Sequence, residues 1–251
     1  MRVSSELAST VNTLLLESVD SSESGHRNIF DDAWLHRDVS IGNIMILKHS
    51  GQRRFVDLGE KVAEEAPELF EGVLHDADHA ISSWDIDNIR SEYRSGTLLY
   101  MSIRVLKNWI ESDDSEDVPS SHSALDDLES FVWVMTHMII YFVKAKATTV
   151  WLRQLGSQNR ADLLGFKRGI ESGILENLSD SRPSAMTPFY PYLARLFTLA
   201  NEGATVARTL GSSQSQAQLT EQQIRDTCRD LYRRYSEIII EAAEILPASW
   251  N

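Results

Sequence analysis

The sequence predicts a mainly α-helical protein with a few short strands, and three observations support this fold class. From about Leu125 onward, apolar residues recur mostly at three- and four-residue steps, the period of one helix face. A few short apolar runs, chiefly residues 44–47 and 72–74 with Phe55-Val56 as a shorter one, have the character of strands. The 251 residues are 42% hydrophobic and 24% charged, which is typical of a globular protein with a sizeable core.

The N-terminal half alternates short ordered segments with polar ones. Residues 3–17 carry apolar side chains at helical spacing and predict a first helix, and the polar residues 18–25 break it. Residues 29–35 lead into a loop, and the strand at 44–47 ends at a turn around His49–Gln52. Residues 53–71 are charged and mixed, so we predict a surface insertion before the second strand.

The C-terminal half is predicted to be helical after one polar segment. Residues 111–121 are rich in acids and serines and cannot bury themselves, so we expect an exposed acidic loop. The last helix opens with the capping-box spacing Thr220-Glu221-Gln222-Gln223. We predict helices over residues 128–143, 148–156, 160–176, 189–203 and from about 220 onward.

Composition excludes several classes of protein. The chain has 24 Lys and Arg against 37 Asp and Glu, a net charge of −13, and no basic stripe, which argues against nucleic-acid binding. The longest uncharged apolar stretch, 131–143, is shorter than the roughly 18 residues needed to cross a bilayer. A single cysteine, Cys228, and an N-terminus without a signal-peptide pattern favour an intracellular protein, cytoplasmic or nuclear and not secreted.

The most informative stretch reads Leu-His-Arg-Asp-Val-Ser-Ile-Gly-Asn and ends at Asn43. It places Asp38 and Asn43 five positions apart after His36 and Arg37. Phosphoryl transfer explains this spacing, because it needs a carboxylate to accept a hydroxyl proton and a nearby amide oxygen to help hold Mg²⁺ against nucleotide phosphates. Asp38 is the candidate base, Asn43 the candidate ligand, and Arg37 a further candidate catalytic residue.

This string resembles the catalytic loop of the fungal-type protein kinases, His-Arg-Asp-(Ile/Val)-Ser-x-Gly-Asn-Ile. The resemblance covers residues 25–143 and fades through 144–251. It implies a single protein-kinase-like large lobe that binds ATP and Mg²⁺ and transfers phosphate to Ser or Thr hydroxyls of a protein substrate. In this comparison His36 is a structural support of the loop.

Two aspartates compete for the role of second metal ligand. The stretch Gly72-Val73-Leu74-His75-Asp76-Ala77-Asp78-His79-Ala80 is similar to the family's Asp-x-Asp-x-Ala segment, which assigns the role to Asp76. Asp57, in Asp57-Leu58-Gly59, is the rival because it follows Asn43 at an ordinary spacing for that role. The shorter sequence separation from Asp76 to the Gly96–Thr97 pair favours Asp76 over Asp57.

Two further stretches carry the resemblance. Residues 96–106 resemble the end of an activation segment, which places Thr97 on the acceptor side, but Ser-Ile-Arg ending at Arg104 stands where most kinases have Ala-Pro-Glu. The stretch from His122 to Phe131 is close to the family's His…Asp-Asp-Leu-Glu-Ser-Phe signature, which gives Asp127 a supporting bond to the catalytic loop. Hydroxyls within 91–95 are candidate phosphorylation sites that could pair with Arg37.

Parts of an ordinary kinase are missing from the sequence. Only 35 residues precede His36, no two glycines are two positions apart, and no Gly-x-Gly-x-x-Gly exists. We therefore expect a kinase-like large lobe whose small lobe is absent or truncated. We also expect weak or no catalytic activity of this chain. The alternative is a silent pseudokinase that binds partner proteins. A small-molecule phosphotransferase of related fold ranks last.

Overall fold

A computed structural model describes residues 25–27, 29–32, 34–51, 70–82, 96–113, 122–143, 146–175, 184–211 and 221–249. These residues are mostly helical with a few short strands, so the predicted fold class is confirmed. The predicted helix at 3–17 lies outside the described residues. Among the described residues, no helix is long and apolar enough to cross a membrane.

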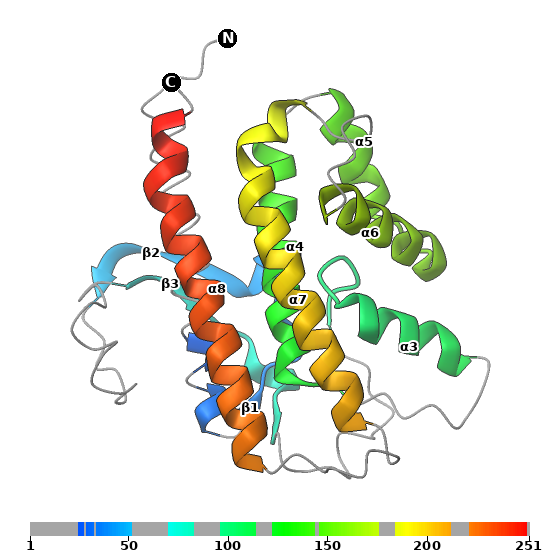
Figure 1. The fold of residues 1–251 in the computed structure, drawn as a ribbon, viewed down its shortest axis with the longest axis vertical. Helices are drawn as coiled ribbons and strands as arrows, with labels where there is room; N and C mark the ends of the chain where they lie inside the picture. Colours follow the sequence, from blue (N-terminus) through cyan, green and yellow to red (C-terminus); the bar gives the residue numbers. More distant parts are fainter. Residues whose placement is uncertain are drawn as a thin grey trace.

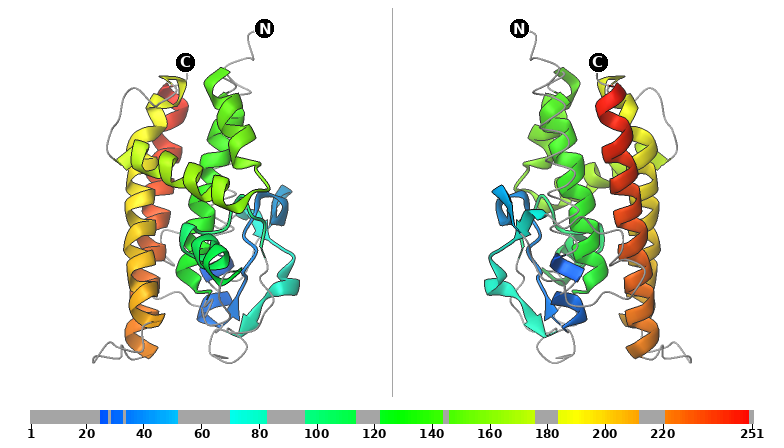
Figure 2. Two further views of the ribbon diagram at one scale, coloured as in Figure 1. Left: turned by 90° about the vertical axis from the view of Figure 1, so that its right-hand side faces the viewer. Right: turned by 90° about the vertical axis from the view of Figure 1, so that its left-hand side faces the viewer.

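The centre of the fold is helix α4, Ala124–Val143, which lies between the strands on one side and helices α7 and α8 on the other (Figures 1 and 2). Its apolar residues are buried nearly all round; Phe131, Trp133 and Ile140 have no exposed area. Such a helix is expected in the core of a protein. The Trp133 and Phe197 rings pack edge to face at 5.1 Å and join α4 to α7.

Further helical elements lie around α4 in the described part of the chain. Helices α7 and α8 run alongside it, and α3, α5 and α6 cover another side (Figure 1). Their bounds are α3 Ile103–Asp113, α5 Lys146–Leu155, α6 Arg160–Leu175, the 3-10 helix η4 Ser184–Phe189, α7 Tyr190–Gly211 and α8 Glu221–Ser249.

Two small antiparallel pairs make up the strands. β1, Trp34–Leu35, pairs with β4, Ile81–Ser82. β2, Ile44–Gly51, pairs with β3, Phe70–Leu74, with Ile44 opposite Leu74. The 3-10 helix η1, Ile41–Asn43, precedes β2, and the 3-10 helix η2, Ala77–His79, follows β3, so both flank the open end of this hairpin. The pairing therefore places the segment after β3 beside the segment before β2.

Several bounds differ from the sequence predictions. β2 continues through His49 and Ser50, where a turn was predicted, and β3 already includes the last two residues of the predicted insertion 53–71. α4 begins four residues earlier than predicted, and α7 extends to Gly211. Helix α3 was not predicted, and it contains the first three residues of the predicted acidic loop 111–121. The remainder of both segments lies outside the described residues.

Candidate active site

The loop between β1 and η1 carries the predicted catalytic residues. His36, Val39 and Ser40 are buried, and Asp38 is half-buried. The three buried side chains anchor the loop in the protein, which holds the Asp38 backbone in a fixed place.

Three hydrogen bonds fix the carboxylate of Asp38. Its Oδ1 accepts from the Thr97 backbone N–H at 2.8 Å and from the Thr97 hydroxyl at 3.1 Å. Its Oδ2 accepts from Asn43 Nδ2 at 3.1 Å. The structure thus brings together Asp38, Asn43 and Thr97, which are separated by up to 59 positions in the sequence.

The side-chain amide of Asn43 is oriented by the same contacts. Its Nδ2 also donates to the Asp38 backbone carbonyl at 2.8 Å. Because both partners of Nδ2 are acceptors, the amide nitrogen must point to Asp38 and the Oδ1 atom must point elsewhere. Within the described part of the chain Oδ1 has no hydrogen-bond partner, so it can serve as a ligand for a hard cation.

The β2–β3 hairpin carries Asp76 to the side of this loop. The His75 backbone N–H donates to the Asn43 carbonyl at 2.9 Å, and the His75 carbonyl accepts from His36 Nε2 at 3.1 Å. The next residue, Asp76, is exposed and adopts the left-handed conformation, with φ of 64°. Strained backbone of this kind gathers at functional sites, and Asp tolerates it better than most residues.

The His36 ring links the Asp38 loop to the segment of His75, and its two hydrogen bonds define its protonation state. Nε2 must carry a proton, because its partner is the His75 carbonyl, and Nδ1 must accept, because it faces the Asp38 backbone N–H at 3.3 Å. This ring is therefore neutral. Burial lowers the pKa of His36 from its ordinary value, which favours this neutral state, although the negative charge of Asp127 favours the protonated ring.

A buried carboxylate at the start of α4 holds the loop from below. Asp127 has no exposed area, and its Oδ2 accepts from the Arg37 backbone N–H at 3.1 Å and from His26 Nε2 at 2.8 Å. Its Oδ1 accepts from His122 Nε2 at 2.7 Å. Although burial opposes ionisation, the two imidazoles hold the pKa of Asp127 well below its usual value. Tyr232 of α8 completes the cluster with a 2.6 Å bond to His26 Nδ1.

Arg37 and Gly96 show why the loop needs these supports. Arg37 has φ of 69°, which an arginine adopts at a cost, and the bond from its N–H to Asp127 stabilises that conformation. Gly96 has φ of 121°, and a Cβ atom there would lie 3.0 Å from the Arg37 carbonyl oxygen. Glycine is required at 96 so that Thr97 can reach Asp38.

The oxygens of Asn43 and Asp76 suit Mg²⁺. This ion takes one or two protein oxygens and completes its shell with water and phosphates. No group of three or more His, Cys, Asp or Glu side chains that could hold a metal occurs in the described ranges, so a closed structural metal site is not formed by them. The rival ligand Asp57, and the candidate phosphorylation sites at 91–95, lie outside the described residues.

A known protein family matches the part of the chain that contains this loop. A model of the family described as fungal protein kinase matches residues 7–139, more than half of the chain. The chain belongs to the fungal protein kinase family. The match includes the loop of Asp38, the segment of Asp76 and the start of α4 in this kinase-family protein. A comparison with curated proteins found no match.

A set of polar residues contacts the segment after Thr97, and the sequence did not predict these contacts. Arg104, noted only as a departure from the usual Ala-Pro-Glu, donates from Nε to Asp126 Oδ1 at 3.0 Å, and Ser102 Oγ donates to the same oxygen at 2.8 Å. Tyr100 and His137 are joined by a 2.9 Å bond. The sequence signals were the acidic residues of the 122–131 signature and the single His137 in the apolar stretch that follows, and these do not reveal their partners.

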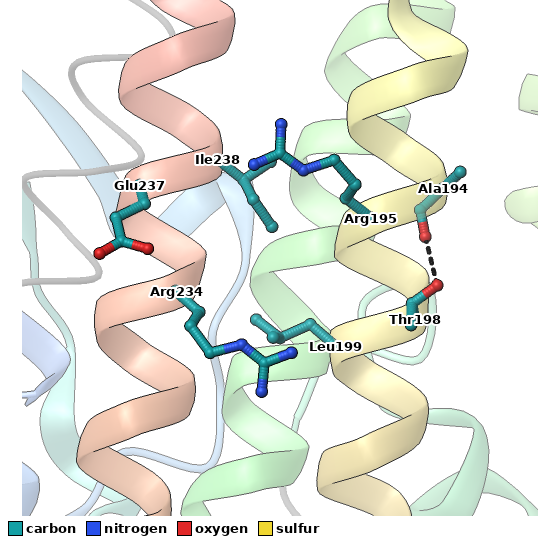
Figure 3. Close-up of a pocket in the computed structure, with 7 residues that line it drawn as sticks. All are labelled: Ala194, Arg195, Thr198, Leu199, Arg234, Glu237 and Ile238. Atoms are coloured by element: carbon teal, nitrogen blue, oxygen red, sulfur yellow. Dashed lines mark hydrogen bonds between the residues drawn. The ribbon is translucent and has the colours of Figure 1, made fainter.

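A pocket between α7 and α8 lies apart from the candidate active-site residues (Figure 3). Arg195 and Arg234 reach into it from facing helices. They already pair with Glu241 and Glu202, respectively, so their charges are balanced by carboxylates of the protein. None of Asp38, Asn43 and Asp76 lines this pocket.

Proposed function

We propose that this protein is a phosphotransferase lobe that transfers phosphate from Mg-ATP to a Ser or Thr hydroxyl of a protein substrate. The observation that carries the proposal is the fixed carboxylate of Asp38, held between Asn43 and Thr97 beside the segment of Asp76. Phosphoryl transfer depends mainly on such positioning, because the protein does little covalent chemistry.

Each residue of the site has a role that follows from its chemistry. Asp38 accepts the proton of the attacking hydroxyl, and the bonds from Thr97 and Asn43 aim its carboxylate. Asn43 Oδ1 and the Asp76 carboxylate would hold Mg²⁺, which neutralises charge on the nucleotide phosphates when it is bound. Asp127 and His36 act through the backbone, by holding Arg37 and the Asp38 N–H in place.

The test is phosphate transfer from radiolabelled Mg-ATP to dephosphorylated casein by the full chain and by Asp38→Asn. Asparagine keeps the shape and can keep a bond from Thr97 but cannot accept the proton. We expect a loss of about a hundredfold or more in kcat for Asp38→Asn. Asp162→Asn, an exposed aspartate in the first turn of α6, is the control and keeps the rate of the unaltered chain. Equal rates for Asp38→Asn and the unaltered protein would contradict the proposal.

A second candidate function is a pseudokinase that binds partner proteins. The sequence contains no Gly-x-Gly-x-x-Gly to cover the phosphates, which favours this alternative. The two functions differ in nucleotide binding, so the effect of Mg-ATP on the melting temperature separates them. A phosphotransferase is stabilised by Mg-ATP in a dose-dependent way, whereas a scaffold without nucleotide binding shows no shift.

A further inference from the structure

Helix α6 contains a lysine that is fully buried in the core. Lys167 has no exposed area, and its Nζ donates to the Met101 backbone carbonyl. The same Nζ atom lies 4.3 Å from the centroid of the Trp133 ring. Burial of an ammonium group costs several kcal/mol unless it is paired and hydrogen-bonded. Such a residue requires an explanation that core packing alone does not give.

Glu129 on α4 supplies an opposite charge that acts on Lys167. This carboxylate is buried, and its Oε1 accepts from the Ile103 backbone N–H at 2.7 Å and from Trp133 Nε1 at 2.9 Å. Burial raises the pKa of Glu129 and lowers the pKa of Lys167, and their mutual attraction opposes both shifts. Glu171, Asp126 and Arg104 are the other charged groups that act on this pair.

Lys167 and Glu129 hold backbone groups two residues apart in one short segment. Met101 and Ile103 lie between Thr97, which bonds to Asp38, and the body of α3. The Tyr100 and Met101 N–H groups both donate to the Thr97 carbonyl, at 2.8 and 3.1 Å, so the turn that starts at Thr97 ends at the residue that Lys167 holds.

Polar residues along one face of α4 contact residues 100–104, and the two segments run in opposite order. Positions 126, 129, 133 and 137 are spaced by three and four residues and therefore share a face of the helix. From the last to the first of them, they contact Tyr100, then Lys167 at the Met101 carbonyl, then the Ile103 N–H, and finally Arg104. The polar groups of α4 thus match the course of residues 100–104.

We propose that Lys167 and Glu129 are positioning residues that hold residues 97–103 against Asp38 and, through them, position the protein acceptor. The acceptor role rests on the proposed function; the ordering of residues 97–103 does not. Neither residue touches Asp38, so they act through the Met101 carbonyl and the Ile103 N–H.

The experiment compares Lys167→Met with the double variant Glu129→Gln/Lys167→Met in the full chain. Lys167→Met leaves the Glu129 carboxylate buried without its partner, so the melting temperature should fall. The double variant removes both charges, and the glutamine oxygen can still accept from Ile103 and Trp133, so it should recover most of the melting temperature. The Met101 carbonyl still loses its donor. Lys107→Met, which removes a lysine from an exposed pair with Glu111 on α3, is the matched control.

Two measurements report on the segment itself. Amide hydrogen exchange of residues 97–103 should be about tenfold faster in the double variant than in the unaltered chain, because one hydrogen bond to a charged group contributes about a factor of ten or more. With dephosphorylated casein as acceptor, KM should rise about tenfold while kcat changes less, and Lys107→Met should change neither.

The outcomes separate this inference from the proposed function. Unchanged exchange at residues 97–103 in the double variant, with a recovered melting temperature, would overturn the positioning role. An unchanged casein KM in an active double variant would overturn it as well. If the unaltered chain transfers no phosphate, the proposed function fails, and the hydrogen exchange alone then decides whether Lys167 and Glu129 order the segment.

Discussion

Removal of the Asp127 carboxylate should cost more stability than any other single carboxylate deletion near the site. The side chain has no exposed area and accepts hydrogen bonds from His26, His122 and the Arg37 N–H. Asp127→Ala leaves all three donors in a buried cavity without an acceptor. The same substitution at Asp230, an exposed aspartate that pairs with Arg233, is the control.

The magnitude follows from those three bonds. Each hydrogen bond to a charged group contributes about 1.5–3 kcal/mol. The loss of one partner of a buried charged cluster costs about 3–5 kcal/mol in total, less than the sum of the separate bonds, because the groups that lose their partner partly rearrange. We therefore expect Asp127→Ala to lower the free energy of unfolding by about 3–5 kcal/mol, and the melting temperature by about 6–20 °C for a chain of this size. Asp230→Ala should change the free energy by less than about 1 kcal/mol.

Asp127→Asn gives a finer test of the same geometry. The amide oxygen can still accept from His26 and Arg37, and the amide NH₂ can donate to a neutral His122 ring. The loss should be about 1–2 kcal/mol, because the bonds persist without the charge. Urea unfolding followed by tryptophan fluorescence measures all three variants. A loss below about 1 kcal/mol for Asp127→Ala would refute the claim that this carboxylate supports the loop.

Three further predictions concern the same region. Gly96→Ala should destabilise by about 1–3 kcal/mol in urea unfolding, because its φ of 121° and the Arg37 carbonyl at 3.0 Å exclude a Cβ atom, whereas Gly165→Ala, with open space in α6, should not. Arg104→Met should cost about 3 kcal/mol by leaving Asp126 buried without its cation, and adding Asp126→Asn should restore part of the loss; additive losses would contradict this. His36 has a lowered pKa, so the stability it contributes is present above its unfolded pKa of about 6.5 and is lost as the pH falls through its folded pKa. Unfolding free energies measured between about pH 7 and pH 5 should therefore fall less steeply in His36→Gln; equal slopes would exclude this role.

Periodicity was enough to predict most of the helical half. Helices α4 to α8 have apolar faces at three- and four-residue spacing, and their predicted positions differ from the observed ones mainly at the ends. α4 begins earlier than predicted because its first turn holds acidic residues, which favour a helix N-terminus but interrupt the apolar pattern. α3 was missed because residues 96–106 were interpreted as one activation segment.

The contacts of the site could be predicted only where one motif contains both partners, or where the family resemblance pairs two motifs, as it does for Asp127 and the catalytic loop. Asp38 and Asn43 lie on one loop, so their spacing predicted a joint role. Lys167 and Met101 are 66 positions apart, and nothing in the sequence pairs them. The two-residue strand β1 was equally inaccessible, because its pairing with β4 depends on tertiary structure and carries no local signal.

Mg²⁺-dependent nucleotide binding distinguishes the two candidate metal ligands, Asp76 and Asp57. Isothermal titration of ATP into the full chain, with and without Mg²⁺, should be compared with the same titrations of Asp76→Asn and Asp57→Asn. Mg²⁺ should strengthen ATP binding to the unaltered chain and to Asp57→Asn, and Asp76→Asn should lose this dependence. Loss in Asp57→Asn with full Mg²⁺ dependence in Asp76→Asn would contradict this prediction.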